Sequence, residues 1–126
     1  MIRTFAAVLL GSVVGVISAA EPTQISSKQE LKAAVAGART PADHERIAYY
    51  YRSQADEFKR KQAEEEQRAA QWANIYAGRT KTPNAYDSAM KLASYYKEEA
   101  RKALDKADEH AKLARTGETP PAIKTP

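Results

Sequence analysis

Two histidines are the first residues of this chain whose side chains could support metal binding or acid–base chemistry. The chain has 126 residues, and His44 and His110 are its two histidines. Neither has a second histidine three or four residues away, the spacing that puts two imidazoles on one helix face. In the helical hairpin predicted below, position 110 lies opposite about position 51, so His44 should be displaced from His110 by roughly 10 Å along the axis. We therefore expect no metal site, because a closed site needs about four ligands.

Carboxylates are numerous, as in the glutamates at 64–66, but acid–base catalysis needs a pocket that shifts their pKa values. A pair of long helices offers no obvious pocket of that kind. The sequence has no glycine-rich phosphate loop and no nucleophile elbow. It also has no cysteine, which removes thiolate catalysis, cysteine-based metal sites and disulfides. The sequence predicts a protein that is not an enzyme and carries no cofactor.

The first 20 residues, MIRTFAAVLLGSVVGVISAA, have the layout of a secretory signal peptide. The positive charge of Arg3 precedes an apolar run, and the small residues Ser18 and Ala20 fit the −3 and −1 positions of a cleavage site before Glu21. The run is short, and too interrupted by glycines, for a membrane span of about 20 residues. We expect an exported protein, periplasmic or secreted. Retention of the segment as an anchor is the alternative, and it would be the only attachment to a membrane.

The formal net charge of +4 and the pI near 9.3 raise the question of nucleic-acid binding. Acidic and basic residues alternate in short blocks, as in DEFKRKQAEEEQR at 56–68, which is typical of a solvated helix face. Export would also separate the protein from the chromosome. The charge pattern therefore argues against a nucleic-acid partner.

Capping residues divide most of the chain into two long helices. Thr40 and the proline after it predict a helix start, and no further glycine or proline occurs until Gly78. A second Thr-Pro pair starts another helix, which Gly117 should end. The expected helices cover about 41–77 and 83–116. Their short connection, GRTKT, must fold them back as an antiparallel hairpin.

A shorter helix should precede the hairpin. Ser27 and Glu30 stand at the spacing of a capping box, and Gly37 marks a stop, which predicts about nine residues of helix. Such a helix is too short to be stable alone, so it either packs on the hairpin or frays. The predicted all-α organisation is a short helix and linker at 21–40, the hairpin at 41–116, and a disordered, proline-rich tail at 117–126.

The two long helices also resemble each other. At an offset of 45 residues, an A-x-Y-Y-[RK]-x-x-A core occupies 48–55 and again 93–100, and the match extends to Lys61 and Lys106. This pattern indicates that a single-helix unit was duplicated and that both copies make similar contacts.

Heptad spacing puts one series of residues, the hairpin seam, on the facing sides of the two helices. Folding the hairpin about residue 80 brings Tyr51 near His110 and Tyr96 near Glu65, which would give each buried phenol a polar partner. Other large side chains should face alanines, so that the coiled-coil-like helices approach closely. The predicted seam comprises Tyr51, Phe58, Trp72, Tyr76, Tyr86, Tyr96, Ala103 and His110.

Further apolar side chains lie off the seam, because successive helix residues are turned by roughly 100°. The predicted flanking stripe comprises Ile47, Tyr49, Tyr50, Leu92, Tyr95 and Leu104. Two alanine-rich helices bury little apolar area, so this stripe should be covered. The cover is a second copy of the chain, the short helix of the same chain, or a different protein.

The stretches RTPADHERIAYYYRSQADEF and LASYYKEEARKALDKADEHAKLA carry a resemblance. With their TP-x-D-H-x-x-[IL]-A-x-Y-Y motif, they resemble a set of uncharacterised exported bacterial helical-hairpin proteins, over about residues 25–115. The second helix of those proteins often begins with a His-Cys pair, whereas this chain reads YDSAMKLA at 86–93. The resemblance implies export and a helical hairpin, and it implies no activity.

These features predict an exported, non-enzymatic helical module with a structural or protein-interaction role. Its expected partner is a second copy of the chain, in a homodimer, or an envelope protein. The alternative is a periplasmic chaperone-like or envelope-stress protein, since aromatic stripes on a charged hairpin could shelter unfolded clients.

Cleavage of the leader is directly testable. Protein recovered from the producing cell should begin at or near Glu21 and should lie outside the cytoplasm. N-terminal sequencing of each cell fraction measures this. Recovery of intact Met1 from the membrane fraction would mean that the segment is an anchor instead.

Overall fold

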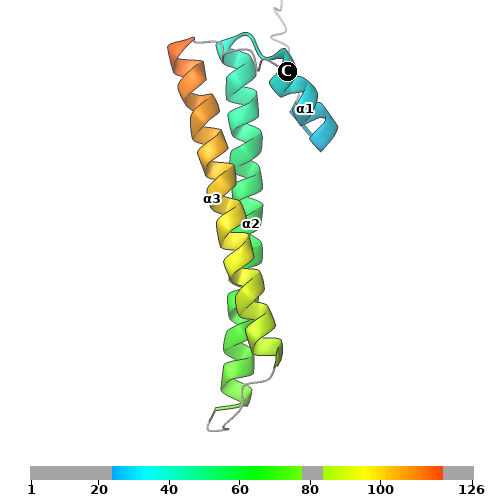
Figure 1. Cartoon of the computed structure of the whole chain (residues 1–126), viewed down its shortest axis with the longest axis vertical. Helices are drawn as coiled ribbons and strands as arrows, with labels where there is room; N and C mark the ends of the chain where they lie inside the picture. Colours follow the sequence, from blue (N-terminus) through cyan, green and yellow to red (C-terminus); the bar gives the residue numbers. More distant parts are fainter. Residues whose placement is uncertain (1–23, 78–83, 118–126) are drawn as a thin grey trace, which may run out of the picture.

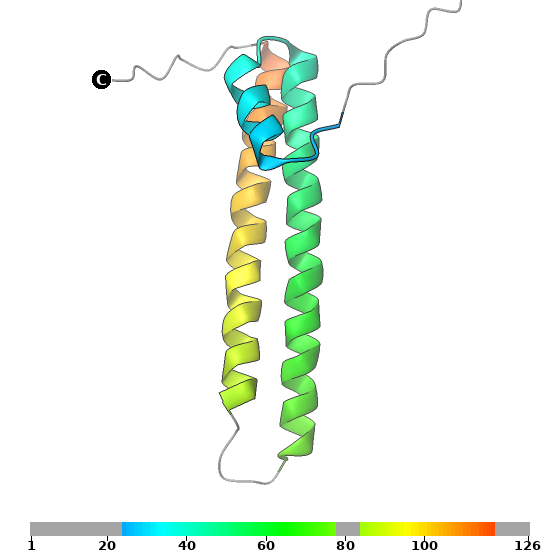
Figure 2. The ribbon, with the colours of Figure 1, turned by 90° about the vertical axis from the view of Figure 1, so that its right-hand side faces the viewer.

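A computed structural model describes residues 24–77 and 84–117, and within them the chain is all-helical. The helices are α1 (Lys28–Gly37), α2 (Pro41–Ile75) and α3 (Asn84–Thr116). Helices α2 and α3 pack side by side as the arms of a hairpin, and α1 packs against α2 near the end where α2 begins (Figure 1 and Figure 2). The prediction of two long paired helices preceded by a short one is confirmed.

Several predicted features lie outside the described residues: the leader at 1–20, the Gly78 and Thr82 caps, and the tail from residue 118 onward. Helix α2 ends two residues before the predicted position and α3 begins one residue after it, within the usual uncertainty of helix ends. No helix in the described part of the chain is both long and apolar enough to cross a membrane.

The start of α2 is fixed by side-chain capping. Thr40 Oγ1 accepts a hydrogen bond from the backbone N–H of Asp43 at 3.2 Å. In return, Asp43 Oδ2 accepts hydrogen bonds from the backbone N–H groups of Arg39 and Thr40, both at 3.0 Å. These two backbone donors lower the pKa of the Asp43 carboxyl. The cap, with Pro41 in the first turn, satisfies N–H groups that have no partner within the helix.

Two other helix ends follow the glycine and serine signals. Ser27 Oγ accepts from the backbone N–H of Glu30 at 3.1 Å, but the Glu30 carboxylate accepts from the N–H and hydroxyl of Ser26, at 2.7 and 2.8 Å. The return half of the expected capping box is therefore displaced by one residue. At the end of α3, Gly117 has a φ of 65°, and its N–H donates to the Leu113 carbonyl at 3.0 Å, as in an αL C-cap.

Alanines dominate the interface between α2 and α3. The buried alanines of the two helices are Ala48, Ala55, Ala69, Ala89, Ala93, Ala100, Ala103 and Ala107. Of the predicted seam, Ala103 and His110 are buried and the six aromatic residues are half-buried. Small side chains in the centre let the helix axes approach, and the large rings lie along the edges of the contact.

The contact predicted between Tyr96 and Glu65 is absent from the hydrogen bonds of the described residues. Tyr96 stacks on Phe58, with ring centroids 6.3 Å apart, and the Glu65 carboxylate accepts hydrogen bonds from Arg68 at 2.9 and 3.0 Å. A side chain in a coiled-coil interface inserts among four residues of the facing helix, which span seven positions. The Tyr96 ring contacts Phe58 at one end of that span, and Arg68 pairs with Glu65 at the other end.

The sequence repeat appears in the structure as reciprocal contacts between the helices. The ammonium of Lys61 on α2 lies 5.8 Å from the ring centroid of Tyr96 on α3. The matching Lys106 on α3 lies 5.3 Å from the ring centroid of Tyr51 on α2. Each copy of the repeat thus places its lysine over the tyrosine of the other copy, in cation–π geometry.

The alanine interface predicts that enlarging one buried alanine destabilises the hairpin. Ala55 is 0% exposed, so Ala55→Leu should lower the free energy of unfolding by about 1–3 kcal/mol, as overpacking does. Ala63 is exposed on the same helix, so Ala63→Leu should be nearly neutral, because both residues favour helix. Thermal melting followed by circular dichroism compares the two. Equal melting temperatures for the two variants would contradict this interface.

Candidate functional site

The two histidines meet at the end of the hairpin where α2 begins and α3 ends. The Nδ1 atoms of His44 and His110 are 3.0 Å apart, and the ring centroids are 5.3 Å apart in a stacked arrangement. Both residues are buried, at 3% and 9% exposed. The expectation that roughly 10 Å separates them along the axis is therefore wrong.

The error has a simple geometric cause. The His110 ring also stacks with Tyr51, at a centroid distance of 6.0 Å, as the register about residue 80 predicts. His110 thus inserts between Tyr51 and His44, which stand seven positions apart on α2, as interlocking helices require. A register that assigns a single opposite residue to His110 identifies Tyr51 as its partner and misses His44.

The geometry constrains the protons of the pair. A hydrogen bond between the two Nδ1 atoms needs one donor and one acceptor, so at least one imidazole must be neutral. The Nε2 atom of His44 is buried and has no hydrogen-bond partner. An unpaired buried N–H costs more than an unpaired lone pair. We therefore assign His44 as the Nδ1–H donor and His110 as the acceptor.

The surroundings of the pair favour uncharged groups. Burial lowers the pKa of His110, the nearby His44 lowers it further, and Glu109 opposes the shift. Burial raises the pKa of Tyr51, and Tyr50 and Glu109 contribute in the same direction. The surroundings of His110 and Tyr51 thus favour the uncharged forms of these two side chains.

The histidine pair has few of the ligands that a metal site needs. Among the described residues, no group of three or more histidine, cysteine, aspartate or glutamate side chains could hold a metal ion. The two Nδ1 atoms already bond to each other. In the observed arrangement, the pair acts as a buried hydrogen bond that ties α2 to α3.

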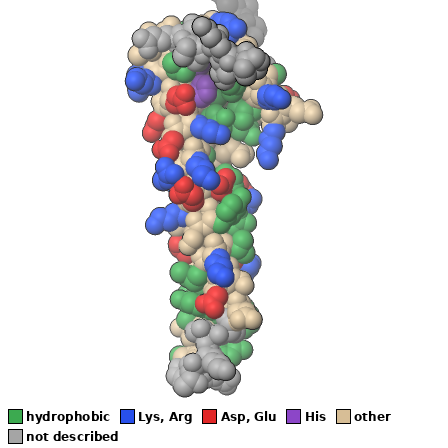
Figure 3. Space-filling view, viewed as in Figure 1, with side chains coloured by type: hydrophobic (Ala, Val, Ile, Leu, Met, Phe, Trp, Pro, Cys, Tyr) green, Lys and Arg blue, Asp and Glu red, His purple; other side chains and the backbone are tan. Residues whose placement is uncertain are grey.

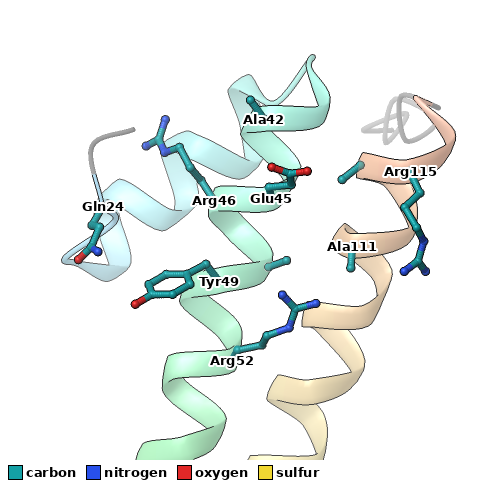
Figure 4. Close-up of a pocket in the computed structure, with 10 residues that line it drawn as sticks. Gln24, Ala42, Glu45, Arg46, Tyr49, Arg52, Ala111 and Arg115 are labelled. Atoms are coloured by element: carbon teal, nitrogen blue, oxygen red, sulfur yellow. The ribbon is translucent and has the colours of Figure 1, made fainter. Parts of the chain in front are cut away.

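A groove lies beside this end of the hairpin. It has a volume of about 1050 Å³ and runs over α2, α3 and the segment before α1. Its floor is formed by alanines, and its polar lining is Gln24, Glu45, Arg46, Tyr49, Arg52 and Arg115. Figure 4 shows Arg52 reaching from α2 toward α3, and Arg115 extending along α3 toward the level of Ala111.

Sequence reasoning missed this groove, because its residues come from three segments. One signal was present. Arg115 has Ala111 and Lys112 at the two preceding positions on its helix face, so no acidic residue there can neutralise it. The tertiary fold brings residues of α2 and of the segment before α1 next to α3. Spacing along the chain does not predict this.

The residues of the predicted flanking stripe divide into three groups. Tyr49, Leu92 and Tyr95 are 57%, 40% and 55% exposed. Tyr50 and Leu104 are half-buried. Ile47 is 0% exposed, so it is a core residue and cannot meet a partner.

Helix α1 packs against α2 in the region of Ile47. Asp43 and Arg46 line the crevice between α1 and α2, and Ile47 lies one turn after Asp43 on the same side of α2. Of the three covers expected for the stripe, the short helix of the same chain packs over this part.

Comparisons with known proteins add no assignment: no protein-family model matches the chain, and neither a curated protein nor a solved structure matches it.

The lowered pKa of His110 predicts a pH dependence of stability. The pKa of His110 is lower in the folded chain than its ordinary value near 6.5. The unfolded chain therefore binds more protons, and the free energy of unfolding should fall as the pH drops through about 6.5. His110→Gln should be less stable than the wild type at about pH 7.5 and should lose most of the decline toward about pH 5.5.

Urea unfolding of both proteins at the two pH values measures this. The lowered carboxyl pKa values of Glu30 and Asp43 start from 4.5 and 3.8, so these groups titrate below the tested range. A wild-type stability that is unchanged or higher at the lower pH would contradict the lowered pKa of His110.

Proposed function

We propose that this chain is an exported, non-enzymatic helical module that associates with a second copy of itself. Its exported location rests on the leader pattern. Self-association rests on one observation: the two copies of the internal repeat are covered unequally, and the uncovered copy presents Leu92 and Tyr95.

The repeat makes the comparison direct. Ile47 of the first copy corresponds to Leu92 of the second, and Tyr50 corresponds to Tyr95. Ile47 is 0% exposed and Leu92 is 40% exposed. Tyr50 is half-buried, whereas Tyr95 is 55% exposed. Helix α1 packs near the first pair, and no described helix packs over the second.

Leu92 and Tyr95 form one apolar face, because residues three apart lie together on a helix. Tyr95 is held edge-on against Tyr96, with ring centroids 5.4 Å apart. Aromatic residues are enriched at the centres of interfaces. This face is suited to contact with another helix.

The charges around the face favour a second copy over a partner of one sign. Acidic and basic side chains are interspersed with hydrophobic ones on the side of the hairpin shown in Figure 3. On α3, Arg101 pairs with Glu98 and Asp105, and Lys102 pairs with Glu99. Such a mixed surface complements itself when a two-fold axis brings the same patch of two chains together. Two hairpins would then form a four-helix bundle.

Sedimentation velocity over a concentration series tests the association. The wild type should show a dimer whose fraction rises with concentration. Leu92→Ser combined with Tyr95→Ser should shift the protein to monomer while circular dichroism shows unchanged helix content.

Tyr49→Ser is the matched control, because Tyr49 is an equally exposed tyrosine outside this face; it should leave the dimer intact. A wild type that stays monomeric at every concentration would contradict the proposal. If that monomer also suppresses aggregation of unrelated unfolded proteins, the chaperone-like role is the correct one.

A further inference from the structure

The arginines of the groove differ from the other arginines of the hairpin. Arg60, Arg68 and Arg101 each pair with a glutamate on their own helix. The three arginines that line the groove have no ion pair with any described residue: Arg46, Arg52 and Arg115. Among the described residues, Arg60, Arg68 and Arg101 thus have carboxylate partners, whereas the arginines of the groove have none.

The unpaired arginines come from both arms of the hairpin. Arg52 projects from α2 and Arg115 from α3 (Figure 4). The groove is also lined by Ala48, Ala111 and Ala114. These small residues leave room beside the guanidinium groups. A planar guanidinium offers paired N–H donors that fit two oxygens of one carboxylate or phosphate group.

We propose that this groove binds a small ligand bearing phosphate or carboxylate groups, held between Arg52 and Arg115. Tyr49 also lines the groove from α2, and its ring extends away from Arg52 (Figure 4). The volume of about 1050 Å³ is at the upper end of the usual range for small-molecule sites.

Two neighbouring residues set the limits of the site. Arg46 has a buried Nε atom without a hydrogen-bond partner, and it also lines the crevice between α1 and α2 together with Glu30 and Asp43. It therefore lies near two carboxylates and contributes less. Glu45 places a carboxylate in the same groove and opposes an anion there.

The test is calorimetric titration of the purified protein with inorganic pyrophosphate and, separately, with citrate, at low ionic strength. Arg52→Gln combined with Arg115→Gln should raise the Kd at least about tenfold, because it removes the charge-assisted hydrogen bonds to the anion. Glu45→Gln should lower the Kd.

The matched control is Arg60→Gln combined with Arg101→Gln, which removes the same net charge from surfaces outside the groove. It should change the Kd less than about twofold, the size of a screened long-range effect. Circular dichroism verifies that every variant remains helical.

Binding of pyrophosphate but not citrate would support the site and assign it to phosphate groups; the reverse would assign it to carboxylates. Equal weakening in the groove and control variants would show diffuse charge attraction and overturn the proposal. Failure of both anions to bind the wild type would overturn it as well. Neither result depends on dimer formation, because the variants leave Leu92 and Tyr95 intact.

Discussion

The close approach of α2 and α3 along a strip of alanines is the constraint on which the rest of the structure depends. Small side chains in the centre bring the helix axes together, but they bury little apolar area per residue. Ile47 is the one large apolar side chain among the described residues with almost no exposed surface. The fold must draw its remaining stability from the rings along the edges of the contact, from the capped helix ends and from pairs of charges along each helix.

The internal repeat explains both the regularity of this hairpin and its asymmetry. The reciprocal placement of Lys61 over Tyr96 and of Lys106 over Tyr51 is what a duplicated unit folded back on itself should produce. The histidine pair breaks the repeat: position 44 corresponds to Ala89, and position 110 corresponds to Glu65. The two imidazoles, the groove and α1 all lie at one end, so that end is specialised. The second copy keeps an uncovered apolar face.

Sequence reasoning found the features that depend on local chemistry. The capping residues Thr40, Ser27 and Gly117 mark helix ends within two residues, because capping is decided by a few neighbouring atoms. Of the seam that heptad spacing predicted, Ala103 and His110 are buried and the six aromatic residues are half-buried. Export, the absence of enzymatic activity and the partner stay predictions.

Features that depend on how side chains interlock were harder to predict from the sequence. The histidine pair was missed because a side chain meets residues one turn above and one turn below it, while a register pairs single positions. The groove was missed because Arg52, Arg115 and Gln24 come from three segments, and no spacing along the chain connects them. The burial of Ile47 was not predicted, because the sequence did not decide whether α1, a second copy of the chain or a different protein covers the flanking stripe.

Cysteine cross-linking tests most directly the claim that the uncovered copy of the repeat is a self-association surface. The chain has no cysteine of its own, so a single introduced thiol reports on one position. Leu92→Cys places it on the apolar face, and Ser94→Cys places it two residues away, roughly 200° around α3. The account predicts that mild oxidation converts Leu92→Cys to a disulfide-linked dimer much faster than it converts Ser94→Cys. Equal rates for the two variants would contradict it.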